Sequence, residues 1–237
     1  MPKKVREKNC FYFVTLQRLI LASVLIGMPK SGAAIEIQSI TDAEMALIPR
    51  YCAYAQSFPK YNTPEGRQWE ARLGEKSFSS IHHYCWGLVN LQRAMRSSTS
   101  RGRRLALLST ITGDFEYSIR GSAKDFVLLP EMLTRNGEVY LLRSLPSDAN
   151  KSFSQARALK ADYWPAYSRW VEFLMYSGKT TEAKILVKAG LKHSPNSKVL
   201  REQDRLLSGN SSKTAGPIEE RPSAGTAEDA TTPQSAQ

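Results

Sequence analysis

The chain has 237 residues, of which 41% are hydrophobic and 23% are charged, with 33 Lys and Arg against 22 Asp and Glu. These proportions exclude a disulfide-stabilised mini-protein, a collagen-like chain and a multispan membrane protein, and they predict one domain with a sizeable core. The formal net charge is +11, but residues 1–34 supply +5 of it, so the remaining +6 is ordinary for a chain of this length.

Residues 1–34 have the order of features of a secretory signal peptide. A basic stretch at 1–10 precedes an apolar stretch that is strongest over Leu19–Gly27, and small residues lead up to Ala33 and Ala34. We therefore expect cleavage after one of these two alanines and a periplasmic or secreted mature protein.

The alternative is an uncleaved anchor in the inner membrane, formed by residues 11–28. Gln17 and Arg18 interrupt this stretch, so its apolar run is shorter than the roughly 20 residues that a membrane span needs. Cleavage is the preferred interpretation for that reason.

Export makes the remaining cysteines an even pair in an oxidising compartment, because Cys10 lies in the signal segment. A Cys52–Cys85 bond would close a loop of about 34 residues and stabilise the fold by roughly 3–4 kcal/mol. Two free buried thiols are one alternative, and a metal site from His82, His83 and Cys85 is another. Only His82 and Cys85 share a helix face, and two ligands do not close a metal site, so no metal is expected.

Segment 35–76 is expected to be an N-terminal extension of helical and irregular parts. Residues 41–44 have the spacing of a capping box before a short helix, and residues 50–62 contain aromatics and a proline that favour an irregular connector. A Thr-Pro pair at 63–64 then predicts the start of a helix that runs to about residue 74.

Segment 77–129 is expected to be a degenerate pair of helices. Apolar residues recur at helical spacing over 77–96 and again over 103–120, with a polar loop between them. Gly87 supplies a small residue where the two helices would touch. No stretch of the chain alternates convincingly at period two, so the sequence predicts an all-α fold.

Segments 130–163 and 164–197 align with each other without a gap at a period of 34 residues. Small residues and a proline stand at fixed places in this period: Gly137, Ala149 with Ala183, Ala156 with Gly190, and Pro195. The pattern resembles the tetratricopeptide repeat, a unit of two antiparallel helices. Two helices packed about 8–10 Å apart need small side chains where their backbones approach.

Three positions depart from the family's pattern. Asn136 replaces a large apolar residue, Val171 replaces a small one, and Ala161 replaces the proline that ends the second helix. Without that proline, the helix before Ala161 is expected to run on.

The resemblance implies a short α-solenoid of antiparallel helix pairs with an N-terminal helical extension. The stretch FVLLPE at 126–131 before the two repeats, with HHYCWGL at 82–88 upstream, resembles the exported tetratricopeptide-type proteins of Gram-negative bacteria. A terminal repeat needs a cap, and residues 198–207 are expected to form that capping helix. Residues 208–237 are rich in Ser, Thr, Ala, Gly, Pro and Glu and contain no aromatic residue, so a disordered tail is expected.

No catalytic motif stands out: the chain has no G-x-S-x-G, H-E-x-x-H, glycine-rich phosphate loop or Cys-x-x-Cys. We expect no enzyme and no cofactor. In the repeat family, the first helices line a groove that receives a peptide. The resemblance assigns to that groove Arg135, Glu138, Leu142, Arg169, Glu172, Met175 and Tyr176.

Spaced arginines beside an apolar wall would suit an acidic peptide or a C-terminal carboxylate. The alternative is that Arg135 and Arg169 each pair with the glutamate three residues later on the same helix. The family's clamp for chaperone tails is not expected, because Thr134 and Ser168 stand where it needs other residues.

A second candidate surface is a cluster of arginines with no acid between them: Arg93, Arg96, Arg101, Arg103 and Arg104. It would suit an anionic glycan, a membrane surface or an acidic protein. The alternative is a solvated loop whose cations favour a helix C-terminus. Nucleic acid is not expected, because aromatics are not interleaved with the arginines and the chain is predicted to be exported.

The expected function is therefore a non-catalytic scaffold or adaptor in the bacterial cell envelope, which holds another exported protein or peptide in its groove. The alternative is an accessory component of an envelope or exopolysaccharide export assembly, acting through the arginine cluster.

Overall fold

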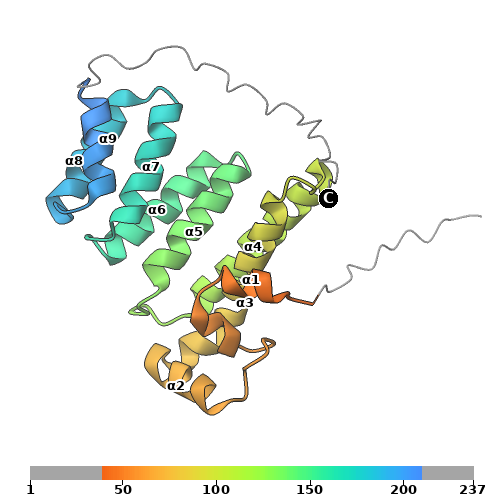
Figure 1. Ribbon diagram of the computed structural model, residues 1–237. Coiled ribbons are helices and arrows are strands. Elements are labelled where there is room, and N and C mark those ends of the chain that lie inside the picture. The colour runs from red at the N-terminus through yellow and green to blue at the C-terminus, as the bar shows by residue number, and fades with distance from the viewer. Residues whose placement is uncertain (1–38, 210–237) are drawn as a thin grey trace, which may run out of the picture. The chain divides into compact units, whose positions relative to one another are not determined.

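The computed structural model describes residues 39–209, and every regular element in this range is a helix (Figure 1). The predicted all-α fold is confirmed for this part of the chain. The predicted signal segment 1–34, the alternative anchor at 11–28 and most of the predicted tail at 208–237 lie outside the described residues. Within 39–209, no helix is both long enough and apolar enough to cross a membrane.

The N-terminal extension consists of α1 (Asp42–Ala46), the 3-10 helix η1 (Arg50–Tyr54) and α2 (Pro64–Leu73). The capping box predicted before α1 is present: the hydroxyl of Thr41 accepts the Glu44 N–H at 3.2 Å, and the Glu44 carboxylate accepts the Thr41 N–H at 3.0 Å. The connector at 50–62, which was expected to be irregular, begins with the 3-10 helix η1.

Helices α3 (Glu75–Met95) and α4 (Arg101–Gly121) pack against each other as a hairpin. A Cβ atom added at Gly87 of α3 would lie 2.4 Å from the Phe115 ring of α4, so only glycine permits this approach. Helix α4 begins two residues earlier than the periodicity indicates, because the Ser100 hydroxyl caps it by accepting the Arg103 N–H at 3.3 Å.

Two further hairpins follow, α5 (Leu129–Leu142) with α6 (Pro146–Leu159) and α7 (Trp164–Tyr176) with α8 (Thr180–His193). Helices α6 and α8 begin one 34-residue period apart. The small residues of that period lie at helix contacts. A Cβ atom at Gly137 would approach the Phe153 ring to 2.8 Å, and Ala149, Ala156 and Ala183 are completely buried.

The expected continuation of the helix past Ala161 is wrong. Helix α6 ends at Leu159, and Lys160 has an extended conformation with φ −144° and ψ 94°. The Ser194 hydroxyl donates to the Asp162 carbonyl at 2.8 Å, which ties the following turn to the end of α8. At Ala161, where the family has a proline, this hydrogen bond to Ser194 therefore lies next to the end of α6.

Helix α9 (Lys198–Leu207) packs on α7 and α8, in the place predicted for a capping helix. Ser197 caps its N-terminus by accepting the Leu200 N–H at 3.3 Å. Leu200 and Leu207 point into a small apolar core shared with α7 and α8, while most of the helix remains exposed.

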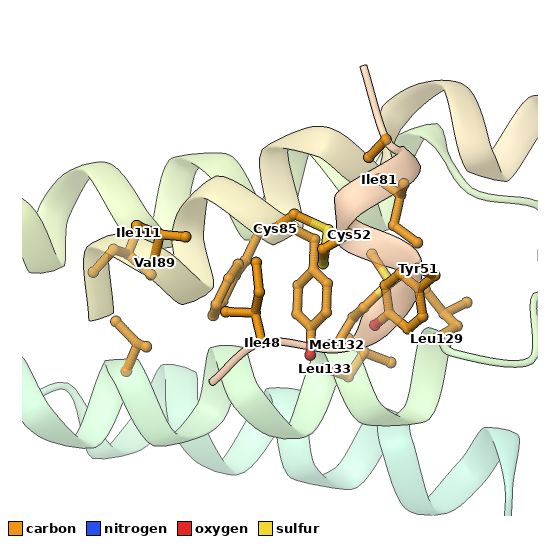
Figure 2. Packing of buried hydrophobic residues seen from close by; sticks show 14 of the residues in the cluster. Ile48, Tyr51, Cys52, Ile81, Cys85, Val89, Ile111, Leu129, Met132 and Leu133 are labelled. Carbon is orange, nitrogen blue, oxygen red and sulfur yellow. A yellow bond between two sulfur atoms is a disulfide. The ribbon is translucent and has the colours of Figure 1, made fainter. Parts of the chain in front are cut away.

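A larger core joins η1, α3, α4 and α5 around a disulfide between Cys52 and Cys85 (Figure 2). The two Cα atoms are 5.5 Å apart and both cysteines are fully buried. The predicted pairing is confirmed, and the alternative of two free thiols is wrong. Figure 2 shows Tyr51 and Ile81 packed near the bond and Leu129 on the neighbouring α5.

The segment 40–58 lies along one face of α3 and is bonded to α3 at two separate places. Besides the disulfide, Arg93 Nε donates to Glu44 Oε1 at 2.7 Å and Arg96 Nη2 donates to the same oxygen at 2.6 Å. The Gln92 amide adds a bond to the Glu44 carbonyl at 3.4 Å. Only 3% of Glu44 is exposed, so this is a buried carboxylate held by two guanidinium groups.

Candidate functional site

A shared glycine contact relates α3 to α5, and the 34-residue period of the sequence relates α5 to α7. Gly87 and Gly137 make the same contact with the ring of a following helix, and two residues before them stand Cys85 and Arg135. One 34-residue period after Arg135 stands Arg169 on α7. On α3 this face is covered by the segment 40–58, in which Cys52 bonds to Cys85. On α5 and α7 it is open.

The open face contains two neighbouring pockets. The first, which we call the charged pocket, has a volume of about 500 Å³ and extends from α5 across α7 to α9. Its lining residues are Glu131, Thr134, Arg135, Glu138, Tyr163, Trp164, Pro165, Ser168, Arg169 and Val199. The second, the apolar pocket, has a volume of about 360 Å³ and is lined by Glu138, Leu141, Leu142, Arg169, Glu172, Phe173 and Tyr176.

A ladder of ion pairs separates the two pockets. Arg135 Nη1 lies 2.9 Å from Glu138 Oε2, and Arg169 Nη1 lies 3.2 Å from Glu172 Oε2. These are the pairs of the alternative interpretation. Arg169 Nε also reaches Glu138 Oε1 at 2.7 Å, which links α7 to α5.

The ladder keeps both arginines engaged. Burial opposes the charge on Arg135, but the Glu138 carboxylate outweighs it and the pKa of Arg135 is raised. Each guanidinium has five N–H donors and keeps some of them outside these pairs, but its positive charge already faces a glutamate carboxylate. The glutamates therefore reduce the net positive charge that the two arginines offer to an acidic partner, although both arginines line the pockets.

The apolar pocket has exposed hydrophobic walls. Tyr176 is 85% exposed and Leu142 is 44% exposed, while Trp164 at the rim of the charged pocket is 40% exposed. Six of the seven predicted groove residues line one pocket or both. The exception is Met175, which packs against the core between α7, α8 and α9.

Glu131 and Val199 line the charged pocket but were not among the residues predicted from the sequence. Glu131 stands one helical turn before Arg135 on α5, so the helical spacing would have placed it on the same face. Val199 comes from α9 and reaches the pocket only through the packing of α9 on α7.

The predicted arginine cluster is divided by the fold. Arg93 and Arg96 bind Glu44, and Arg104 Nε donates to the Ala94 carbonyl at 2.9 Å. Arg101 and Arg103 are exposed and have no ion pair within residues 39–209. Glu44, the acid that pairs with Arg93 and Arg96, lies on α1. The sequence next to the arginines gives no sign of this partner.

The histidine pair of α3 forms no closed metal site. His83 Nδ1 lies 2.9 Å from Asp114 Oδ1 on α4, and the rings of His82 and His83 are 4.4 Å apart. Burial, followed by the neighbouring His83, lowers the pKa of His82. Cys85 is taken by the disulfide, and residues 39–209 contain no group of three or more candidate metal ligands.

A scan against protein-family models finds no match for this chain, and searches of the curated proteins and of the solved structures find none either.

Proposed function

We propose that the helix pairs α5–α6 and α7–α8 are tetratricopeptide-type repeats, and that the protein is a non-catalytic scaffold of the bacterial cell envelope. In this proposal the face formed by α5 and α7 binds a segment of another exported protein. The apolar pocket receives a large hydrophobic side chain of that segment, and the charged pocket receives its polar part.

The observation that carries the proposal is the pair of pockets that share Glu138 and Arg169 on one rigid face. The exposed side chain of Tyr176, beside Leu142 and Phe173, provides apolar surface that is in contact with solvent and that a partner could bury. Aromatic anchors in such pockets supply most of the binding energy in many protein interfaces.

The covering of α3 supports the same interpretation. The segment 40–58 already lies on the face of α3 that corresponds to the open face of α5 and α7. It uses a short helix, a 3-10 turn and side chains that fill the space between α3 and α5. A polypeptide segment is therefore a suitable occupant of this kind of face.

Site-specific photo-crosslinking in living cells tests the proposal. The photoreactive amino acid p-benzoylphenylalanine replaces Tyr176 in one strain and Leu142 in a second. A third strain carries it at Ile185, which is 67% exposed on α8 and lines neither pocket. We expect one protein to be crosslinked from positions 176 and 142 and not from position 185, and mass spectrometry identifies it.

Equal labelling from all three positions, or none from 176 and 142, would refute the proposed face. A fourth strain with the crosslinker at Arg103 covers the alternative function. Crosslinking of a glycan-export component from that position alone would move the binding surface to the exposed remainder of the arginine cluster, Arg101 and Arg103.

A further inference from the structure

The face of α5 and α7 carries one carboxylate more than its arginines can match. Its charged residues are Glu131, Arg135, Glu138, Arg169 and Glu172. Glu138 forms ion pairs with Arg135 at 2.9 Å and with Arg169 at 2.7 Å. Glu172 forms an ion pair with Arg169 at 3.2 Å. Glu131 is the carboxylate left over, because it makes no ion pair within residues 39–209.

Glu131 has acceptor capacity to spare. Its Oε1 accepts the hydroxyl of Tyr84 at 2.9 Å, and that is its one hydrogen bond to another side chain in the described part of the chain. Arg135 stands one turn away on the same helix but is directed to Glu138 instead. A carboxylate has room for about four hydrogen bonds, so a donor entering the charged pocket finds unoccupied lone pairs.

Aromatic rings surround this carboxylate. Tyr163 and Trp164 line the charged pocket beside it, and the buried hydroxyl of Tyr51 has no hydrogen-bond partner within residues 39–209. Burial first, and then the negative charge of Glu131, raises the pKa of Tyr163 to about 12 and also raises the pKa values of Tyr51 and Tyr84. These tyrosines therefore stay neutral, and the negative charge in this corner of the pocket rests on Glu131.

We infer that the charged pocket binds a cationic group, the side chain of a lysine or an arginine, on the segment that the scaffold holds. The ammonium or guanidinium group donates to Glu131, and its alkyl stem lies against Trp164 and Tyr163. Cations are attracted to the faces of such rings as well as to the carboxylate. This inference rests on the proposed function for the nature of the partner, and it reverses the preference for acidic peptides that the arginines alone imply.

Small probes test the pocket without the partner. Nα-acetyl-lysine methylamide is titrated into the full chain, and the indole N–H signal of Trp164 is followed by NMR after assignment with a Trp164→Phe variant. Nα-acetyl-norleucine methylamide is the neutral control of nearly the same shape. We expect saturable shifts with the lysine probe and at least fivefold weaker binding of the norleucine probe.

The variant Glu131→Gln keeps an acceptor for the Tyr84 hydroxyl and removes only the charge. We expect it to weaken binding of the lysine probe about tenfold, which is the loss of roughly one charge-assisted hydrogen bond. Glu182→Gln is the matched control, since it removes one negative charge from α8 and lines neither pocket. It should bind the lysine probe as the unaltered protein does.

Equal binding of the two probes, or unchanged binding to Glu131→Gln, would overturn the inference. Tighter binding of Nα-acetyl-glutamate methylamide than of the lysine probe would overturn it too, and would assign the pocket to its arginines. If Glu131→Gln does not fold, the salt dependence of binding to the unaltered chain tests the inference instead. Raising the salt concentration from about 0.02 M to about 0.5 M should weaken binding of the lysine probe and leave binding of the norleucine probe unchanged. Crosslinking from Tyr176 is independent of these titrations, so a failure of the proposed function and a failure of the inference remain distinguishable.

Discussion

The backbone N–H of Tyr84 on α3 donates to the side-chain hydroxyl of Ser118 on α4, at 2.9 Å. The same hydroxyl donates to the carbonyl of Ser80 at 2.7 Å. Ser80 and Tyr84 are four residues apart, which is the pair that an α-helix joins directly. The side chain of one helix therefore takes part in the backbone ladder of its neighbour, and it does so completely buried.

Replacing Ser118 by Ala should show how much this hydroxyl contributes to the free energy of unfolding. The substitution leaves two backbone groups of α3 without the hydroxyl that serves both, so we expect a loss of about 1–3 kcal/mol in the free energy of unfolding. Ser109 on the same helix is exposed. Ser109→Ala should change the stability by no more than about 0.5 kcal/mol in the same urea titration. Equal effects of the two substitutions would mean that the buried hydroxyl contributes nothing special.

Two glycines in neighbouring hairpins should respond to alanine with opposite signs. A Cβ atom at Gly137 would meet the Phe153 ring at 2.8 Å, whereas nothing lies within 4 Å of a Cβ atom at Gly113 in α4. We expect Gly137→Ala to destabilise the protein by about 1–3 kcal/mol through overpacking. Gly113→Ala should stabilise it by about 0.5–1 kcal/mol, because alanine loses less conformational entropy in a helix. Thermal unfolding followed by circular dichroism measures both, and a stabilised Gly137→Ala variant would contradict the close packing of α5 on α6.

Glu44 should make the stability depend on pH in the acid range. The hydrogen bond from Arg93, opposed by burial and helped by Thr41, lowers the pKa of Glu44 from 4.5 to about 2. A carboxylate whose pKa is lower in the folded state binds a proton more readily when unfolded. Its stabilisation is therefore complete above about pH 5 and is lost as the pH falls towards 2, by about 3 kcal/mol in total.

Unfolding free energies of the unaltered protein and of Glu44→Gln, measured between neutral pH and about pH 3, test this dependence. The variant should be less stable by about 3 kcal/mol at neutral pH, since it leaves the buried Arg93 without its counter-charge. Its stability should fall less steeply as acid is added. Parallel pH curves for the two proteins would show that Glu44 does not carry this dependence.

Removal of the disulfide should cost about 3–4 kcal/mol, from the loop that it closes in the unfolded chain. The double substitution of Cys52 and Cys85 by Ala avoids an unpaired buried thiol. Hydrogen exchange adds a local measurement: the amides of η1 should lose more protection than those of α8, because the bond holds η1 on α3. Unchanged exchange in η1 would show that packing alone keeps this segment in place.

The sequence predicts the features that depend on local spacing. The helix pairs over 130–197, the capping helix at 198–207 and the capping box at 41–44 follow from patterns within a few turns of chain. The cysteine pairing follows from counting. Helix α9 spans Lys198–Leu207, the range predicted for the capping helix.

Features that join distant parts of the chain could not be predicted in this way. Nothing near Arg93 in the sequence indicates that its partner is Glu44, and the cross-helix bond from Arg169 to Glu138 needs the relative rotation of two helices. Glu131 lacks an ion-pair partner within residues 39–209 because Arg135 pairs with Glu138 instead. Which of the two glutamates Arg135 binds depends on side-chain geometry in the packed helices.

If the face of α5 and α7 binds a peptide as proposed, the segment fastened over α3 also limits the length of that peptide. Neighbouring helices pack about 8–10 Å apart, so the open face from α5 through α7 to α9 spans about 20 Å. An extended chain crosses that distance in about six residues. A longer ligand on this face would meet the protein's own N-terminal segment at the α3 end and would have to turn away there. By occupying part of its own surface, the chain would set a length limit on the proposed partner that favours short exposed motifs over long continuous ones.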